Sequence, residues 1–265
     1  MSVWLVLPSA RPAAEASACF AYWQEMGYRV CIMRDSAEDA PTNIDALFTP
    51  EPGSGYPGYS RAVNMMAKAV LQQDPACDWI VCGGDDTYPD PNKTADEIAA
   101  ECSVYFGIDQ ATFRIESMTV SDQLNEELSA DVTGTAHSTF GVMQPTGDPW
   151  ADFHKGKMSR IIERIAGSPW LGRDWCLRAY QGNGPLCAEY THCFADEELQ
   201  LVAQRLGVFW QRPDLTHHHE HWSRTPNATR IPPHLAEATS KSHWDKYKAI
   251  FDARKAAGFP GSEPL

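Results

Sequence analysis

The sequence has 265 residues, of which 43% are hydrophobic and 22% are charged. This composition excludes a mainly disordered chain, a collagen-like fibre and a small disulfide-stapled scaffold, and the length suffices for a sizeable core. Lys plus Arg number 22 against 35 Asp plus Glu, and the net charge of −13 excludes a uniformly basic surface for nucleic acid while permitting a local basic face.

The location of the protein is predicted from three features. No segment approaches the roughly 18 uninterrupted apolar residues that span a bilayer. The start of the chain lacks a basic stretch, and its apolar run ends at Pro8, which favours a strand over a signal peptide. The eight cysteines are scattered without a C-x-x-C pair. We therefore expect a cytoplasmic protein with reduced thiols and no membrane span.

The first 90 residues alternate between short apolar runs and helical periodicity. Strands are predicted over 3–7, 28–33, 45–48 and 79–82, with helices over 13–26 and 60–72. The strands are continuously apolar rather than alternating, which is typical of a parallel sheet covered on both faces. The strand–helix repeats therefore predict an α/β fold with a mainly parallel central sheet flanked by helices.

The pattern loosens after residue 90. Helices are predicted over 93–102, 158–166, 196–207 and 234–257, and strands over 104–108, 111–116, 139–143 and 208–210. Residues 144–157 are rich in turn-forming residues. No internal repeat or clean linker divides the chain.

The strongest local motif follows the strand at 79–82. It contains the adjacent carboxylates Asp85 and Asp86 after two glycines. Ligands of open α/β sheets bind at the carboxyl ends of strands, and paired carboxylates there suit Mg²⁺ or Mn²⁺. The alternative is a solvated turn that closes the strand.

Two helix starts carry further candidate residues. Arg61, near the start of the helix at 60–72, could pair with a phosphate. Asp196 opens the helix at 196–207 and could act as a general base. In both cases the alternative is ordinary helix capping and dipole complementarity.

Two segments further along have unusual composition. Four histidines fall within residues 217–221, and in an extended segment His217, His219 and His221 would point the same way and could reach a metal. Residues 154–178 hold six basic residues against two acidic ones, a local charge of +4. That charge could hold a phosphate-bearing ligand, or it could be distributed over ordinary salt bridges.

Taken in order, these motifs resemble the inverting, family 2-like glycosyltransferases of the GT-A fold, including compact phage-type members. The resemblance is carried by the Pro8-Ser9 turn after the first strand, Asp35 after the second, the Gly58-x-x-Arg61-x-x-Asn64 helix start, Gly84-Asp85-Asp86 in place of a D-x-D motif, Ala195-Asp196 in place of an E-D motif, and the later histidines. It covers residues 1–222 and implies a Rossmann-like nucleotide-diphospho-sugar transferase fold. On this reading residues 1–90 are the nucleotide-binding half, 91–222 the acceptor-binding half and 223–265 a C-terminal helical extension.

The resemblance also implies roles for particular residues. The donor would be a nucleoside-diphosphate sugar, contacted by Pro8, Ser9, Arg11, Asp35, Arg61 and Asp85. Because Gly84 replaces the first carboxylate of the D-x-D motif, Mn²⁺ or Mg²⁺ would be held by Asp86 and a histidine, for which we take His219, with His217 and His221 as alternatives. Asp196 would deprotonate the acceptor hydroxyl in an inverting, hexosyltransferase-type reaction. The residues Trp170, Arg173 and Trp175 would form an acceptor wall.

Alternatives remain for the reaction and for the acceptor. A resemblance to the nucleotidyltransferases of the same fold would require a Gly-rich loop after the first strand, but residues 8–15 contain no glycine. A non-catalytic nucleotide- or carbohydrate-binding domain is a second alternative. The basic segment at 154–178 permits a polyanionic acceptor such as a modified base in DNA, and a glycan or small molecule is the other possibility.

Overall fold

A computed structural model describes residues 1–51, 53–117, 139–224 and 233–265 of the chain. Its core is a sheet of seven strands in the order β10-β6-β9-β4-β1-β2-β3. The strands are β1 (Ser2–Pro8), β2 (Arg29–Met33), β3 (Ala46–Phe48), β4 (Cys77–Val81), β6 (Val142–Pro145), β9 (Trp170–Gly172) and β10 (Phe209–Arg212). All neighbours pair in parallel except β9, which runs antiparallel to both β4 and β6. The predicted fold class, α/β with a mainly parallel central sheet flanked by helices, is confirmed.

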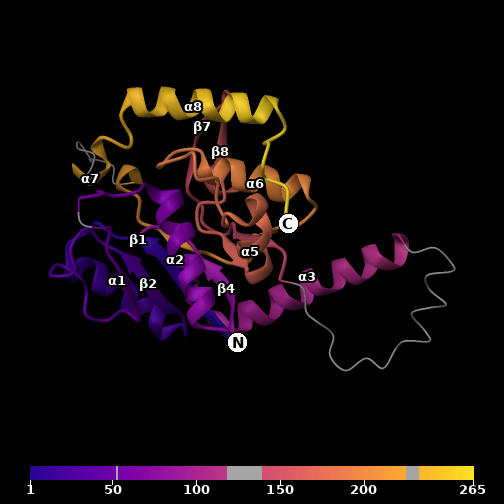
Figure 1. Cartoon of the computed structure of the whole chain (residues 1–265), viewed down its shortest axis with the longest axis horizontal. Coiled ribbons are helices and arrows are strands. Elements are labelled where there is room, and N and C mark those ends of the chain that lie inside the picture. Colours follow the sequence, from indigo (N-terminus) through magenta and orange to yellow (C-terminus); the bar gives the residue numbers. More distant parts are fainter. Residues whose placement is uncertain (52, 118–138, 225–232) are drawn as a thin grey trace.

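Helices cover both faces of the sheet (Figure 1). Side chains alternate between the faces along a strand, so Val3, Leu5 and Leu7 of β1 pack with α1 (Ala13–Glu25) and α3 (Ala95–Ser117). Trp4 and Val6 face the other side, where they pack in one core with α2 (Tyr59–Gln73), α5 (Arg173–Gly182) and α6 (Ala195–Arg205). This two-sided burial explains why the strands are continuously apolar.

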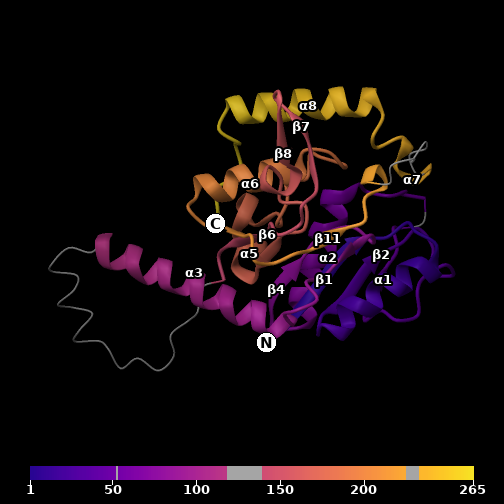
Figure 2. The same cartoon turned by 180° about the vertical axis from the view of Figure 1, so that it is seen from behind.

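The C-terminal part adds a further layer. After α7 (Pro233–Ala236), helix α8 (Lys241–Ala256) lies across one side of the molecule beside α6 (Figures 1 and 2). Its Arg254 donates to both oxygens of the fully buried Glu198 on α6, at 2.9 and 2.7 Å. The Tyr190 hydroxyl donates to the same carboxylate at 2.7 Å. The predicted C-terminal helical extension is thus tied to α6 through a buried ion pair.

Two small sheets lie outside the central one. The first pairs β5 (Thr87–Tyr88) with β11 (His218–His219) in antiparallel fashion. The second is a hairpin of β7 (Ala151–His154) and β8 (Lys157–Arg160), followed by a 3-10 turn at Ile161–Glu163. The predicted helix over 158–166 is therefore wrong, because the segment begins within strand β8, which pairs with β7, and continues into the short 3-10 turn.

Two predicted strands are also wrong. Residues 104–108 and 111–116 belong to the long helix α3. Its buried residues Ala95, Ile98, Ala99, Cys102 and Phe106 recur at three- and four-residue spacing, so a helical face packed on the sheet overrides the local preference of Val104 and Tyr105 for a strand. None of the helices that the structure describes has the length and apolar character needed to cross a membrane.

Candidate functional site

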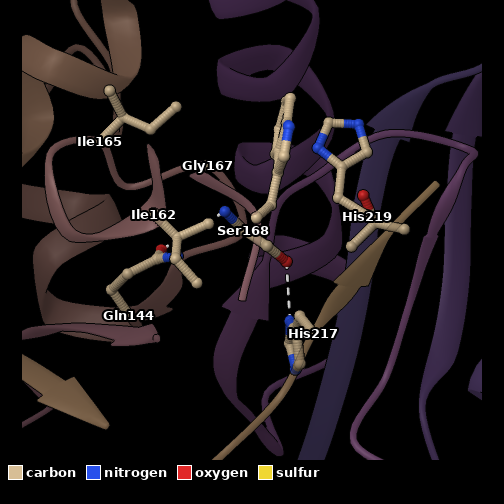
Figure 3. Close-up of a pocket in the computed structure, with 9 residues that line it drawn as sticks. Gln144, Ile162, Ile165, Gly167, Ser168, His217 and His219 are labelled. Carbon is tan, nitrogen blue, oxygen red and sulfur yellow. Dashed lines mark hydrogen bonds between the residues drawn. The ribbon is translucent and has the colours of Figure 1, made fainter. Parts of the chain in front are cut away.

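The candidate site lies where the parallel strands end. The loops after β1 and β4 and the small β5–β11 sheet meet at this edge of the central sheet. A small pocket here is lined by Thr87, Gln144, Trp150, Ile162, Ile165, Gly167, Ser168, His217 and His219. Figure 3 shows Gln144 and Ile162 on one side of it and His219 on the other. The position agrees with the general rule for ligand sites in open α/β sheets.

Asp85 fastens two strand ends together. Its Oδ2 accepts hydrogen bonds from the Ser9 hydroxyl at 2.8 Å and from the backbone N–H groups of Ala10 and Arg11 at 2.9 and 3.0 Å. The Arg34 guanidinium supports the same loop, donating to the Ser9 hydroxyl and to the carbonyl of Arg11. Asp85 therefore orders the loop after β1, and sequence reasoning missed Arg34 as its second support.

Asp86 lies between two cationic or ionisable groups. Its Oδ1 is 3.1 Å from Nε2 of His219, and its Oδ2 is 3.3 Å from Nη2 of Arg11. Burial alone would raise the pKa of Asp86, but the hydrogen bond and charge of His219 and the charge of Arg11 hold it below its usual value. The backbone N–H of Glu220 donates to the Asp86 carbonyl at 2.7 Å, which anchors the histidine segment. Asp86 is thus a carboxylate that stays ionised.

The three predicted histidines occupy different environments. His219 faces Asp86. His217 is buried at the base of the pocket, where its Nδ1 lies 2.7 Å from the Ser168 hydroxyl, and burial lowers its pKa to about 3 (Figure 3). Burial also lowers the pKa of His221, to about 4, and its ring packs 5.2 Å from that of His219. His217 and His219 thus line one pocket, as expected for alternate residues of an extended segment, but they meet different partners, Ser168 and Asp86.

His219 is held from behind by groups that the sequence did not single out. Its backbone N–H donates to the buried carboxylate of Asp148 at 3.2 Å, and Arg224 forms an ion pair with the same carboxylate. The Trp150 ring packs edge-on against His219 at 5.2 Å between ring centres. Asp148 therefore fixes the segment that brings His219 to Asp86.

Asp196 is the second residue of helix α6 and lies beside the wall of the same pocket. Its carbonyl accepts from the N–H of Ala166 at 3.5 Å, next to the pocket-lining Ile165 and Gly167. Burial raises the pKa of Asp196, and the adjoining Glu197 also has a raised pKa, from burial and from the charge of Asp196. An acidic side chain with a raised pKa stays protonated to a higher pH than usual, which suits it to proton transfer.

The fit of a divalent metal can be judged from the side chains present. Within the described parts of the chain, no three or more His, Cys, Asp or Glu side chains are placed to hold a metal ion. Oδ1 of Asp86 and Nε2 of His219 lie 3.1 Å apart, and Mn²⁺ accepts both oxygen and nitrogen ligands. The described residues therefore supply a two-ligand site, whose remaining positions would come from a ligand such as a diphosphate.

The Gly58-to-Asn64 motif serves the fold. Gly58 has φ of +90°, and an added Cβ would lie 2.8 Å from the Cα of Thr191. Asn64 exchanges two hydrogen bonds with the backbone of Leu186. The Nε of Arg61 donates to the carbonyl of Ala188 at 3.1 Å. Arg61 was predicted to contact the donor, but here it helps to fasten α2 to the segment that leads to α6.

The predicted acceptor wall is wrong. Trp170 and Trp175 are fully buried on opposite faces of the sheet. Arg173 donates to the backbone carbonyls of Leu71 and Cys77 at 3.0 and 2.9 Å. All three are structural because the sheet and its covering helices enclose them. Of the other predicted donor contacts, Pro8 is half-buried at the end of β1 and Asp35 is exposed after β2.

The basic segment at 154–178 does not form one surface. Arg160 pairs with Glu163 and Arg164 with Asp152. Arg173 is bound to backbone as described, and Arg178 donates to the carbonyl of Leu265. Lys155 and Lys157, at the tip of the β7–β8 hairpin, form neither an ion pair nor a side-chain hydrogen bond with any residue that the structure describes.

Comparisons with known proteins locate this chain only broadly. No protein-family model matches it, and no curated protein matches it in sequence. Among solved structures it is similar to a glycosyltransferase involved in the glycosylation of the major capsid of PBCV-1, with 10% identity and a TM-score of 0.27 over 66% of this chain and 62% of that one. It is also similar to a structure described as a glucose-1-phosphate thymidylyltransferase from Bacillus anthracis, with 7% identity and a TM-score of 0.35 over 95% of both chains. At these TM-scores the similarities carry no weight for activity.

Proposed function

We propose that this protein is a glycosyltransferase that moves a sugar from a nucleoside-diphosphate sugar to an acceptor hydroxyl. The observation that carries the proposal is the convergence of Arg11, Asp86 and His219 at the carboxyl edge of the sheet. A diphosphate needs cationic partners there, and Arg11 can offer two parallel N–H donors to its oxygens. The Ser9–Arg11 loop, ordered by Asp85, would receive the nucleoside.

Asp86 and His219 are the residues that would hold Mn²⁺ or Mg²⁺. Such an ion, when bound, would neutralise the charge that grows on the departing diphosphate. Arg11 lies against Asp86, and in the donor complex its guanidinium would turn to a phosphate oxygen. Asp86 would then bind the metal ion in place of Arg11, and its position in the loop would not change.

Asp196 would act as the general base. It would accept the proton of the acceptor hydroxyl as that oxygen attacks the anomeric carbon, while the bond from that carbon to the diphosphate oxygen breaks. The attack comes from the face opposite the leaving group, so the configuration is inverted and no enzyme nucleophile is needed. The raised pKa of Asp196 suits this role because a stronger base takes the proton more readily.

A nucleotidyltransferase is the second candidate, since the same sheet edge would bind a nucleotide. It would join a nucleoside triphosphate to a sugar phosphate and release pyrophosphate. The two reactions are separated by their products. Purified protein incubated with UDP-, GDP-, CDP-, TDP- and ADP-sugars and Mn²⁺ is expected to release one nucleoside diphosphate, and Asp196→Asn is expected to lower the rate of release by about 10²- to 10⁴-fold. Pyrophosphate release from a nucleoside triphosphate plus sugar phosphate, with no turnover of any sugar nucleotide, would establish the alternative.

A further inference from the structure

The β7–β8 hairpin exposes two large apolar side chains. Phe153 and Met158 are 74% and 69% exposed. They are directly opposite each other in the hairpin register, so they share one face of the two-stranded ribbon. An aromatic and a flexible thioether side by side on a projecting ribbon form a contact surface that the fold itself does not use.

The turn of the hairpin presents two positive charges. Lys155 has φ of +49° and is followed by Gly156 with φ of +78°. Two-residue turns with both central residues at positive φ strongly favour Asn or Gly at the first of them. Lysine at this position is therefore not explained by turn geometry. Lys155 and the exposed Lys157 are also the two cations of the basic segment whose side chains form neither an ion pair nor a hydrogen bond with any described residue.

The hairpin is rooted in the wall of the pocket. Trp150 precedes β7 and Ile162 follows β8, and both side chains line the pocket. The two roots are joined by a hydrogen bond from the N–H of Ile161 to the carbonyl of Trp150, at 2.9 Å. Figures 1 and 2 show the ribbon rising from the central sheet toward the side where α8 lies. A molecule held by the hairpin is thereby held beside the candidate site.

We propose that the hairpin docks a nucleic-acid strand whose nucleotide carries the acceptor hydroxyl; this rests on the proposed function and names its substrate class. Lys155 and Lys157 would contact two phosphates. Phe153, with Met158 beside it, would pack on the face of a base, since every base offers a π-face to an aromatic side chain. A two-stranded ribbon also fits the major groove of a duplex.

Other occupants fit the hairpin less well. A second copy of the chain would have to bury about 800 Å² per partner in a stable dimer, and two side chains offer only part of that. A bilayer would require apolar groups at the leading tip, whereas here the lysines lead and the apolar pair lies one register position behind. The net charge of −13 acts over a Debye length of about 10 Å at 0.1 M salt, so the tip meets a phosphate largely through its own two lysines.

The test is fluorescence anisotropy with short labelled duplex DNA, single-stranded DNA and RNA between about 50 and 200 mM salt. Two phosphate contacts predict a slope of log affinity against log salt of about −1.8 on a duplex or about −1.4 on a single strand. K155Q/K157Q is expected to bring that slope close to zero. F153S/M158S is expected to weaken binding by about 5- to 150-fold with the slope retained.

The matched control is K241Q/K248Q on α8, which removes the same charge from two exposed lysines paired with Asp245 and Asp252. It is expected to bind like the wild type. The proposal is overturned if no nucleic acid binds, if the hairpin variants bind as the wild type does, or if the protein binds phosphatidylglycerol vesicles instead. Thermal shifts with nucleoside diphosphates on the same preparations separate the two claims: shifts without nucleic-acid binding reject the docking role alone, and their absence rejects the proposed function.

Discussion

Nε2 of His219 lies 3.1 Å from Oδ1 of Asp86. The two side chains come from β11 and from the loop after β4, which are more than 130 residues apart in the chain. Their approach depends on the short β5–β11 ladder and on the hydrogen bond from the Glu220 N–H to the Asp86 carbonyl. A carboxylate and an imidazole held this way by backbone bonds are preorganised, so a ligand need not reorder them.

Replacing Arg11 tests whether Asp86 and His219 receive a cation. Arg11→Gln removes the guanidinium 3.3 Å from Asp86 and is expected to tighten Mn²⁺ binding about threefold to tenfold, since the pair is only partly screened from water. Titration of free Mn²⁺ by electron paramagnetic resonance measures it. Asp86→Asn is the control and should bind no Mn²⁺. Equal Mn²⁺ affinity in Arg11→Gln and wild type would count against the site.

The pH dependence of turnover tests the role of Asp196. A base works only when deprotonated, so activity is expected to fall as pH drops through the raised pKa of the Asp196–Glu197 pair. The hydrogen bond from the Glu197 carboxyl lowers the pKa of Asp196, so Glu197→Gln, which offers only a weaker amide donor, should move the acidic limb of the pH–rate profile to higher pH. Asp196→Asn should lower the rate by about 10²- to 10⁴-fold. If the activity of Glu197→Gln falls at the same pH as that of the wild type, the titration of Asp196 does not depend on Glu197.

The buried histidine makes the stability of the fold depend on pH. Burial lowers the pKa of His217 to about 3, whereas an unfolded histidine titrates near about 6.5. As pH falls below about 6.5 the unfolded chain takes up the proton first, so stability is lost toward acid. The wild type should therefore lose about 2 kcal/mol more unfolding free energy between pH 7 and 5 than His217→Gln. Parallel urea midpoints for the two proteins over this range would contradict it.

The ion pair between Arg254 and Glu198 fixes α8 to the helix that carries Asp196. Glu198 is fully buried and both its oxygens are bound, so Arg254→Met leaves a buried charge and should lower the unfolding free energy by about 3–5 kcal/mol. The double variant Glu198→Leu/Arg254→Met should recover much of this loss. Lys255→Met, on the same helix, is the exposed control. Urea unfolding measures all three, and no recovery in the double variant would show that the pair itself is needed.

Much of the sheet was predictable from the sequence. β1 and α2 are long and regular in their periodicity, so local pattern and final structure agree. The three-residue strand β9 was not predicted, because it is too short to show a strand pattern. Its extended conformation is stabilised by pairing with β4 and β6. Residues 104–108 and 111–116 were assigned to strands because their local composition favours strands. The helical spacing of the five buried residues of α3 becomes visible only over a longer window.

The site was predictable only in part. Asp86 follows strand β4, so its position at the sheet edge follows from topology, and Asp196 lies in the first turn of α6, as the sequence predicts. Arg34 and Asp148 act through contacts between segments distant in sequence, for which one chain offers no local signal. Trp170 and Trp175 were misassigned for the converse reason: residue types common in binding sites serve equally well in a core.

The most direct measurement is a thermal-shift panel of UDP, GDP, CDP, TDP and ADP, each with and without Mn²⁺. Ligands that bind the folded state raise its melting temperature by mass action. The account predicts a Mn²⁺-dependent rise for one of these nucleotides, its loss in Asp86→Ala, and its retention in Lys241→Gln as an exposed control. Unchanged melting with every nucleotide, or a rise that persists in Asp86→Ala, would contradict the assignment of this sheet edge as a nucleotide-sugar site.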